Sequence, residues 1–196
     1  MSKDWTGTKD SAFKMLGASN HCDEEREEHD FYATDPKAID ELLKQEQFDI
    51  NIWECACGQG HLSERLKENY HNVYSTDLID RGYADELIDF LKTDKSFNGD
   101  IITNPPYKYC SYFILKALQL TKNKVAMFLK LQTLEGQKRY DEIFSKHPPK
   151  TIYVFVKRIQ CAKNGVFKGS SAVCYAWFVW EKNFIGCTQI KWINHN

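Results

Sequence analysis

The chain has 196 residues, of which 42% are hydrophobic and 14% aromatic, and its formal net charge is -1. The length fits one ordinary domain and the apolar content is enough for a core, which excludes a disordered chain. The net charge by itself gives no indication of a nucleic-acid partner.

The sequence shows no sign of membrane insertion, secretion or metal binding. It contains no run of about 18 apolar residues, and residues 1–10 are polar rather than signal-like. We therefore expect a cytoplasmic protein that makes no membrane contact. The 7 cysteines are irregularly spaced and lack histidines at ligand spacing, which predicts neither disulfides nor a bound metal.

Strand and helix patterns alternate after a polar opening segment. We expect a polar arm over residues 1–30 and a single domain over residues 31–196. Asp35 followed by Pro36 is typical of the start of a helix. The periodicity predicts strands at 50–55, 73–77, 101–103, 124–130, 152–156 and 173–180, and helices at 61–69, 111–120 and 135–146. We expect an α/β fold with a mostly parallel, seven-stranded sheet that ends in an antiparallel hairpin.

Three turns follow strands at the carboxyl edge of this sheet, where ligands of such folds bind. In the first, Glu54 precedes small residues and the glycines Gly58 and Gly60, which let the backbone approach a ligand closely. The alternative there is an ordinary tight loop. In the second, Asp77 ends the next strand, where a carboxylate can accept both ribose hydroxyls or cap a helix.

The third turn is Asn104, Pro105, Pro106 and Tyr107, directly after a short apolar strand. An aromatic amine is a poor nucleophile because its lone pair is delocalised into the ring. The Asn104 side-chain oxygen and the Pro105 carbonyl can each accept one N–H of such an amine and localise the lone pair. Tyr107 can stack on an extruded planar base. The alternative is a turn whose prolines only stop the strand.

Together these motifs resemble the amino-methyltransferases of DNA, and more closely the small phage- and prophage-type adenine methyltransferase-like proteins. The resemblance runs from about Phe31 to the C-terminus and includes residues 134–139, 147–149 and 175–181. One departure is Cys55, where proline is commoner. The resemblance implies a Rossmann-like class I methyltransferase fold, S-adenosyl-L-methionine as cofactor, and catalysis by residues 104–107. It also implies cofactor contacts at Tyr32, Thr34, Glu54, Ala56, Cys57, Gly58, Gly60, Asp77, Leu78, Asp89 and Phe90.

Within that resemblance, Tyr32 and Thr34 touch the methionine end of the cofactor, Asp77 and Leu78 the ribose, and Asp89 and Phe90 the adenine. The implied reaction is methylation of adenine N6 in DNA. RNA adenine or protein glutamine methylation is the enzymatic alternative, and a catalytically silent binding module is the other. The chain has no room for the separate target-recognition domain that site-specific DNA methyltransferases usually carry.

Basic residues are concentrated in the second half of the chain. Residues 107–168 hold 13 lysines and arginines against 3 acidic residues. Such a segment attracts a polyanion if the side chains share a face, and is an ordinary solvated surface if they do not. For the loop 157–171, its place in the basic half of the chain favours substrate contact over an ordinary flexible surface loop. For the aromatic block 175–180, the apolar run favours a core strand over a base-stacking platform. The candidate substrate-binding residues are Lys108, Lys138, Arg139, Lys157, Arg158, Lys163 and Lys168.

Overall fold

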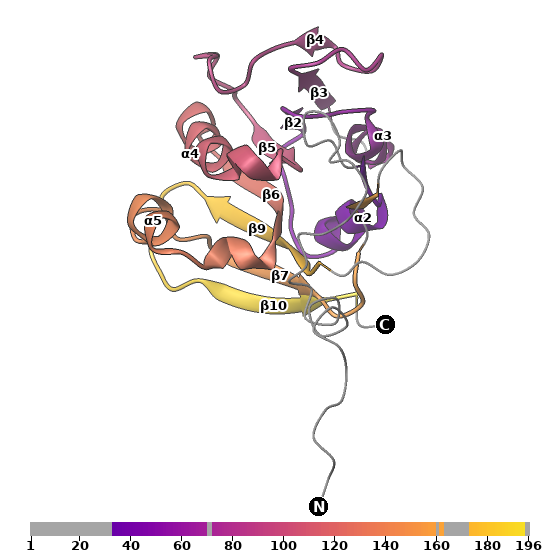
Figure 1. Ribbon diagram of the computed structural model, residues 1–196. Helices are drawn as coiled ribbons and strands as arrows, with labels where there is room; N and C mark the ends of the chain where they lie inside the picture. Colours follow the sequence, from indigo (N-terminus) through magenta and orange to yellow (C-terminus); the bar gives the residue numbers. More distant parts are fainter. Residues whose placement is uncertain (1–32, 70–71, 160, 163–172, 195–196) are drawn as a thin grey trace, which may run out of the picture.

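The computed structural model describes residues 33–69, 72–159, 161–162 and 173–194. An eight-stranded sheet forms its centre, in the order β10-β7-β9-β6-β5-β2-β3-β4 (Figure 1). Its strands are β2 (Asn51–Glu54), β3 (Asn72–Asp77), β4 (Glu86–Leu87), β5 (Asp100–Thr103), β6 (Lys124–Lys130), β7 (Thr151–Phe155), β9 (Tyr175–Glu181) and β10 (Gln189–Ile193). The short strands β1 (Ala33–Thr34) and β8 (Cys161–Ala162) pair antiparallel as a separate two-stranded sheet.

The central sheet is mostly parallel, as the alternation of strands and helices predicts. Strand β9 alone among its strands runs against both neighbours, because it lies between β6 and β7 and pairs antiparallel with each. The predicted antiparallel C-terminal pair is therefore confirmed. The sheet has eight strands rather than seven, and its last strand in sequence, β10, pairs parallel with β7. Four of the five residues of this edge strand are exposed, including the apolar Ile190 and Trp192.

Helices cover both faces of the sheet (Figure 1). On one face, α2 (Lys37–Leu43) and α3 (His61–Glu68) contribute to one core cluster. On the other, α4 (Cys110–Leu120) packs with Ile143, which belongs to a π-helical turn at Tyr140–Phe144 that follows the short α5 (Gln137–Arg139). The predicted helix at 135–146 is thus α-helical only in part, because the Ser145 N–H donates to the Tyr140 carbonyl five residues back.

The central strands are buried on both faces, which explains their continuous apolar sequence. Along β6, Met127 belongs to the cluster under α4 and Phe128 to the cluster under α2 and α3, and both are fully buried. In β9, Trp177 donates its indole N–H to the Ala38 carbonyl at 2.8 Å. Residues 175–180 are all buried, so the aromatic block is core strand, as predicted.

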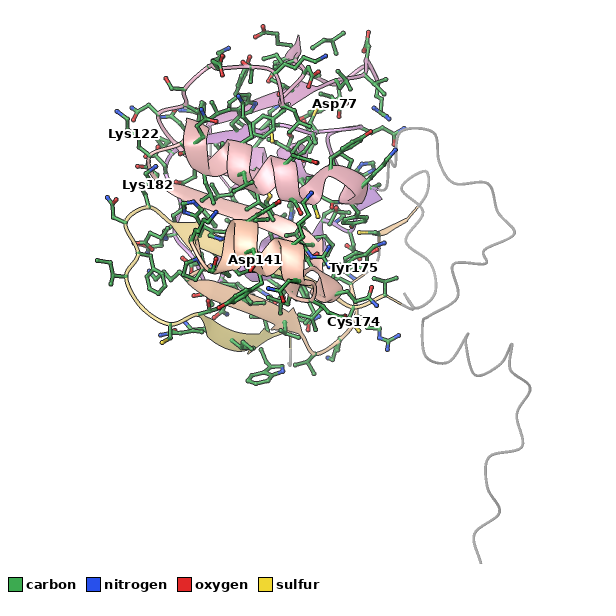
Figure 2. All side chains as sticks on the ribbon, turned by 60° about the vertical axis from the view of Figure 1, so that its left-hand side comes forward. Asp77, Lys122, Asp141, Cys174, Tyr175 and Lys182 are labelled. Atoms are coloured by element: carbon green, nitrogen blue, oxygen red, sulfur yellow. The ribbon has the colours of Figure 1, made fainter. Side chains whose placement is uncertain are left out.

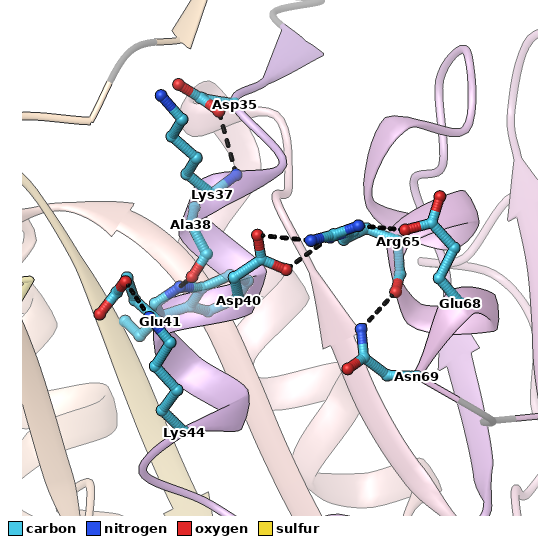
Figure 3. A network of polar contacts seen from close by, with 10 residues as sticks. Asp35, Lys37, Ala38, Asp40, Glu41, Lys44, Arg65, Glu68 and Asn69 are labelled. Atoms are coloured by element: carbon cyan, nitrogen blue, oxygen red, sulfur yellow. Dashed lines mark hydrogen bonds and ion pairs between the residues drawn. The ribbon is translucent and has the colours of Figure 1, made fainter.

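A polar contact joins α2 to α3 on the surface (Figure 3). Arg65 donates to both carboxylate oxygens of Asp40, at 2.5 and 3.0 Å, and also contacts Glu68. The Arg65 side chain is 40% exposed, so solvent screens the pair and its contribution to stability is small. At the start of α2, Asp35 accepts the Lys37 N–H at 3.0 Å, which confirms the predicted helix start within one residue.

Candidate functional site

A cavity of about 920 Å³ lies where β2, β3 and β5 end. Its wall includes residues from each of the three turns that the sequence singled out: Glu54, Asp77 and Asn104 stand directly at or after the carboxyl ends of the three strands. The side chain of Asp77, at the end of β3, is labelled in Figure 2. A parallel sheet therefore brings together groups that are far apart in sequence, as expected.

The turn after β2 lines the cavity through Ala56 and Cys57, whereas Gly58 and Gly60 do not line it. Both glycines have positive φ, of 56° and 84°. A Cβ atom at Gly60 would lie 2.4 Å from the ring of Tyr83. At Gly60 the close neighbour is therefore a side chain of the protein itself, and contact of the two glycines with a cofactor stays a prediction.

The Asp77 carboxylate is held by groups from the turn after β2 and from its own loop. Its Oδ2 accepts the Gly58 N–H at 2.7 Å and its Oδ1 accepts the Ile79 N–H at 3.0 Å. Arg81 pairs with Oδ1 at 3.3 Å, and both of these side chains are largely buried in the cavity wall. Asp77 is thus a fixed acceptor at the cavity surface and does not cap a helix.

Glu54 is buried at the base of the same turn, with 2% of its surface exposed. Ser63 donates its hydroxyl to Glu54, and Ser63 and Ser75 share a further hydrogen bond of 2.7 Å. Burial raises the pKa of Glu54 to about 8, and the charge of Asp77 adds to the rise while Ser63 opposes it. At neutral pH the residue is therefore mostly protonated, so it adds little negative charge to the cavity.

Apolar residues form the wall beyond Asp77. Leu78, Ile88, Phe90 and Leu91 all line the cavity there. Phe90 is 2% exposed and stacks on Phe113 with ring centroids 5.0 Å apart. Asp89 also lines this part, and its hydrogen bond to Lys92 lowers its pKa. The predicted adenine-binding segment therefore contributes apolar side chains and a carboxylate to the cavity wall.

All four residues 104–107 line the cavity. Asn104 donates its side-chain N–H to Thr34 Oγ1 at 2.7 Å. The Tyr107 ring stacks on Tyr175 at 5.7 Å, and its hydroxyl lies 3.2 Å from Cys161 Sγ. Burial raises the pKa of Tyr107 well above its ordinary value, so the phenol stays protonated.

The predicted substrate-binding residues divide into three groups. Lys108 and Arg139 line the cavity. Lys138 is exposed and lies 3.8 Å from Glu142, and neither Lys157 nor Arg158 lines the cavity, so substrate contact by these three stays a prediction. Lys163 and Lys168 lie outside the described residues, as does Tyr32, which was predicted as a cofactor contact.

Sequence reasoning missed several residues of the wall. The most informative is Lys130, the last residue of β6, whose Nζ lies 4.7 Å from the centroid of the Tyr107 ring. The rule that selected the ends of β2, β3 and β5 also applies to β6, so its strand-end position could have revealed it. The other missed residues include Cys55, His61, Leu62, Ile79, Arg81, Ile88, Leu91, Tyr109, Cys110, Phe113, Gln132 and Thr133.

Within the described ranges, no group of three or more His, Cys, Asp and Glu side chains is placed to hold a metal ion. No helix in that same part of the chain combines the length and the apolar character that crossing a membrane requires.

This chain is similar to known proteins in its fold but not in its sequence. No protein-family model matches the sequence, and no curated protein is similar to it. A protein from Listeria monocytogenes assigned as a class I S-adenosylmethionine-dependent methyltransferase matches 80% of this chain with a TM-score of 0.52 and 14% identity. The fold is that of a class I methyltransferase.

Two further structures with this methyltransferase fold belong to restriction enzymes. The type I restriction enzyme EcoKI M protein matches 83% of this chain with a TM-score of 0.56 and 15% identity. A modification subunit assigned to a type I restriction enzyme of Vibrio vulnificus matches 75% with a TM-score of 0.52 and 13% identity. The chain spans 61% of the Listeria protein, 47% of the EcoKI protein and 43% of the Vibrio subunit.

Proposed function

We propose that this protein is an S-adenosyl-L-methionine-dependent methyltransferase that methylates the exocyclic N6 amine of adenine in DNA. The observation that carries the proposal is that Asp77 and residues 104–107 line one cavity. The cavity combines a fixed carboxylate, an apolar slot and an amide acceptor. The resemblance to small phage-type adenine methyltransferases supports the same assignment.

The residues of the cavity fit the proposed cofactor. A volume of about 920 Å³ is within the range of small-molecule sites. Asp77 would accept the ribose hydroxyls, and Phe90 with its apolar neighbours would contact the adenine ring. When bound, the cofactor supplies an activated methyl group on a sulfonium. These residues bind and orient it.

The protein's own contribution to the reaction is to orient and polarise the amine. Because the Asn104 amide nitrogen faces Thr34, its Oδ1 is the atom with which it can accept an amine N–H. The Pro105 carbonyl would accept the second N–H. Acceptors held in this way localise the lone pair and stabilise the positive charge that develops on nitrogen, with no titrating base.

DNA is favoured as substrate by the charge and aromatic character of the cavity wall. Lys108, Lys130 and Arg139 line it together with Tyr107, and Lys130 lies over the Tyr107 ring. Cationic side chains next to a stacking ring suit a flipped base and its phosphates. Two of the three structures reported above are parts of type I restriction enzymes.

The experiment that tests the proposal uses cofactor with a labelled methyl group. Duplex DNA, single-stranded DNA, RNA and total cell protein are offered in parallel, with Asn104→Ala as the control. We expect label in DNA, at adenine N6 after digestion, and loss of the signal in the variant. Label in RNA or in protein glutamine alone would overturn the DNA assignment, and absence of cofactor binding would overturn the enzymatic one.

A further inference from the structure

The two-stranded sheet β1–β8 packs against residues 104–107, and one of its two residue pairs contacts both ends of that segment. Thr34 and Cys161 are direct partners across this sheet, so their side chains project from the same face. The Thr34 hydroxyl accepts the Asn104 N–H at 2.7 Å, and Cys161 Sγ lies 3.2 Å from the Tyr107 hydroxyl. One cross-strand pair therefore contacts the first and last residues of the segment.

The two contacts are connected to each other. Burial raises the pKa of Cys161 to about 11, and hydrogen bonds from Tyr107, Tyr175 and Thr34 to its sulfur oppose that rise. The thiol consequently stays protonated at neutral pH and serves as a polar link rather than a nucleophile. A continuous chain of side-chain contacts then runs from Asn104 through Thr34 and Cys161 to Tyr107.

We infer that Thr34 is a positioning residue for Asn104, and this inference rests on the proposed function. A primary amide has two polar ends, and only the oxygen end can accept an amine N–H. A hydroxyl can bond to either end of an amide, but the Thr34 hydroxyl donates its own proton to the Cys161 sulfur. It is therefore left to accept from Nδ2, and this orientation leaves Oδ1 as the acceptor. Thr34 is 3% exposed, so water does not readily replace it in that contact.

This role differs from the one that the family resemblance implies for Thr34, which is contact with the methionine end of the cofactor. The two roles make opposite predictions for the same variant. A positioning residue changes turnover at saturating cofactor and leaves cofactor affinity alone. A cofactor contact changes the dissociation constant of the cofactor first.

Three variants of the full-length protein separate the roles. Thr34→Val keeps the shape and the β-branch but removes the hydroxyl, whereas Thr34→Ser keeps the hydroxyl. Thr188→Val is the matched control, because the Thr188 hydroxyl also makes a 2.7 Å hydrogen bond, to the Pro149 carbonyl, and Thr188 does not line the cavity.

Two readouts are taken on each variant. The first is the side-chain amide signal of Asn104 in ¹⁵N-labelled protein, identified by its absence in Asn104→Ala. The second is methyl transfer at saturating cofactor, together with cofactor affinity. In Thr34→Val we expect a shifted, faster-exchanging amide signal, turnover lowered about ten- to hundredfold, and cofactor affinity within about twofold of wild type. Thr34→Ser and Thr188→Val should behave as wild type.

An unchanged Asn104 amide signal in Thr34→Val would overturn the inference, as would weakened cofactor binding with normal turnover at saturation. Failure of the proposed function looks different: the wild type itself would transfer no methyl group to any polymer. In that case the amide signal still decides whether Thr34 orients Asn104.

Discussion

Asp77 accepts the Gly58 N–H at 2.7 Å, which ties the end of β3 to the turn after β2. The bond has two consequences. It holds the carboxylate at the cavity wall before any ligand arrives, so little ordering is left to the binding step. It also makes the glycine turn depend on an acidic residue 19 positions further along the chain.

The first prediction concerns this carboxylate. Asp77→Ala should weaken binding of S-adenosyl-L-methionine by about 1.5 to 3 kcal/mol, because charge-assisted hydrogen bonds to the ribose are lost. Calorimetry measures this directly. Asp80→Ala is the control, since Asp80 is exposed in the same loop, accepts the Gly82 N–H at 2.8 Å and does not line the cavity. Equal affinities of a folded Asp77→Ala and wild type would remove Asp77 from the site.

The second prediction concerns the pH dependence of stability. The pKa of Glu54 rises from 4.5 to about 8 on folding, so the folded state binds this proton more tightly than the unfolded chain. The stabilisation is fully present below about pH 4.5 and is lost as the pH rises toward 8, at up to about 1.4 kcal/mol per pH unit. Glu54→Gln should lack this loss, so its stability relative to wild type should increase with pH.

Urea unfolding of wild type and Glu54→Gln at pH 5, 6.5 and 8 checks the second prediction. Stability differences that stay constant across the three values would show that Glu54 has an ordinary pKa in the folded protein.

The third prediction separates backbone strain from packing at the glycine turn. Gly60 and Gly82 have nearly equal φ values, of 84° and 78°, but a Cβ at Gly60 meets the Tyr83 ring and one at Gly82 meets nothing within 4 Å. In both alanine variants the free energy of unfolding should fall by roughly 1 kcal/mol, the cost of a left-handed backbone conformation for a residue with a Cβ atom. Gly60→Ala should lose about 1 to 3 kcal/mol more, the typical cost of overpacking.

A double-mutant cycle with Tyr83→Ala completes the third test. The extra loss in Gly60→Ala should shrink when the ring is absent. If Gly60→Ala and Gly82→Ala were equally stable, the Tyr83 ring would not be the reason for glycine at position 60.

The fourth prediction concerns Lys130, at the cavity end of β6. Lys130→Met should weaken binding of a DNA oligonucleotide and lower the slope of log affinity against log salt by about 0.7 to 0.9, the value for one phosphate contact. Lys122→Met is the matched control, because Lys122 is exposed just before the opposite end of the same strand (Figure 2). Identical salt slopes for the two variants would contradict a role of Lys130 in substrate binding.

The main elements of the fold could be predicted because they bury apolar runs. Strand β6 at Lys124–Lys130 coincides with the predicted range, since its interior residues are fully buried and uninterrupted by polar ones. Strand β10 could not be predicted in the same way, because it pairs through its backbone while most of its side chains are exposed. The π-helical turn depends on a hydrogen-bond register that no side-chain pattern specifies.

The site likewise contains residues that the sequence predicts and contacts that it does not. Asp77 and Asn104 were predictable because Asp77 is the last residue of a predicted strand and Asn104 directly follows another. The contact of Asn104 with Thr34 joins residues 70 positions apart through a two-residue strand, which is too short to leave a pattern. The position of Tyr83 over Gly60 is likewise a tertiary contact, and a Gly-x-Gly motif alone cannot distinguish it from a ligand.

The central claim is that Asn104 polarises the amine that receives the methyl group, and methyl transfer by Asn104→Ala at saturating cofactor tests it most directly. We expect turnover to fall about a hundredfold or more, as for loss of one preorganised transition-state hydrogen bond, with cofactor affinity unchanged. Tyr107→Phe, which keeps the stacking ring, should remain active. Near-normal turnover of Asn104→Ala on every accepted substrate would contradict the account, and a parallel loss of cofactor affinity would make residues 104–107 a structural turn.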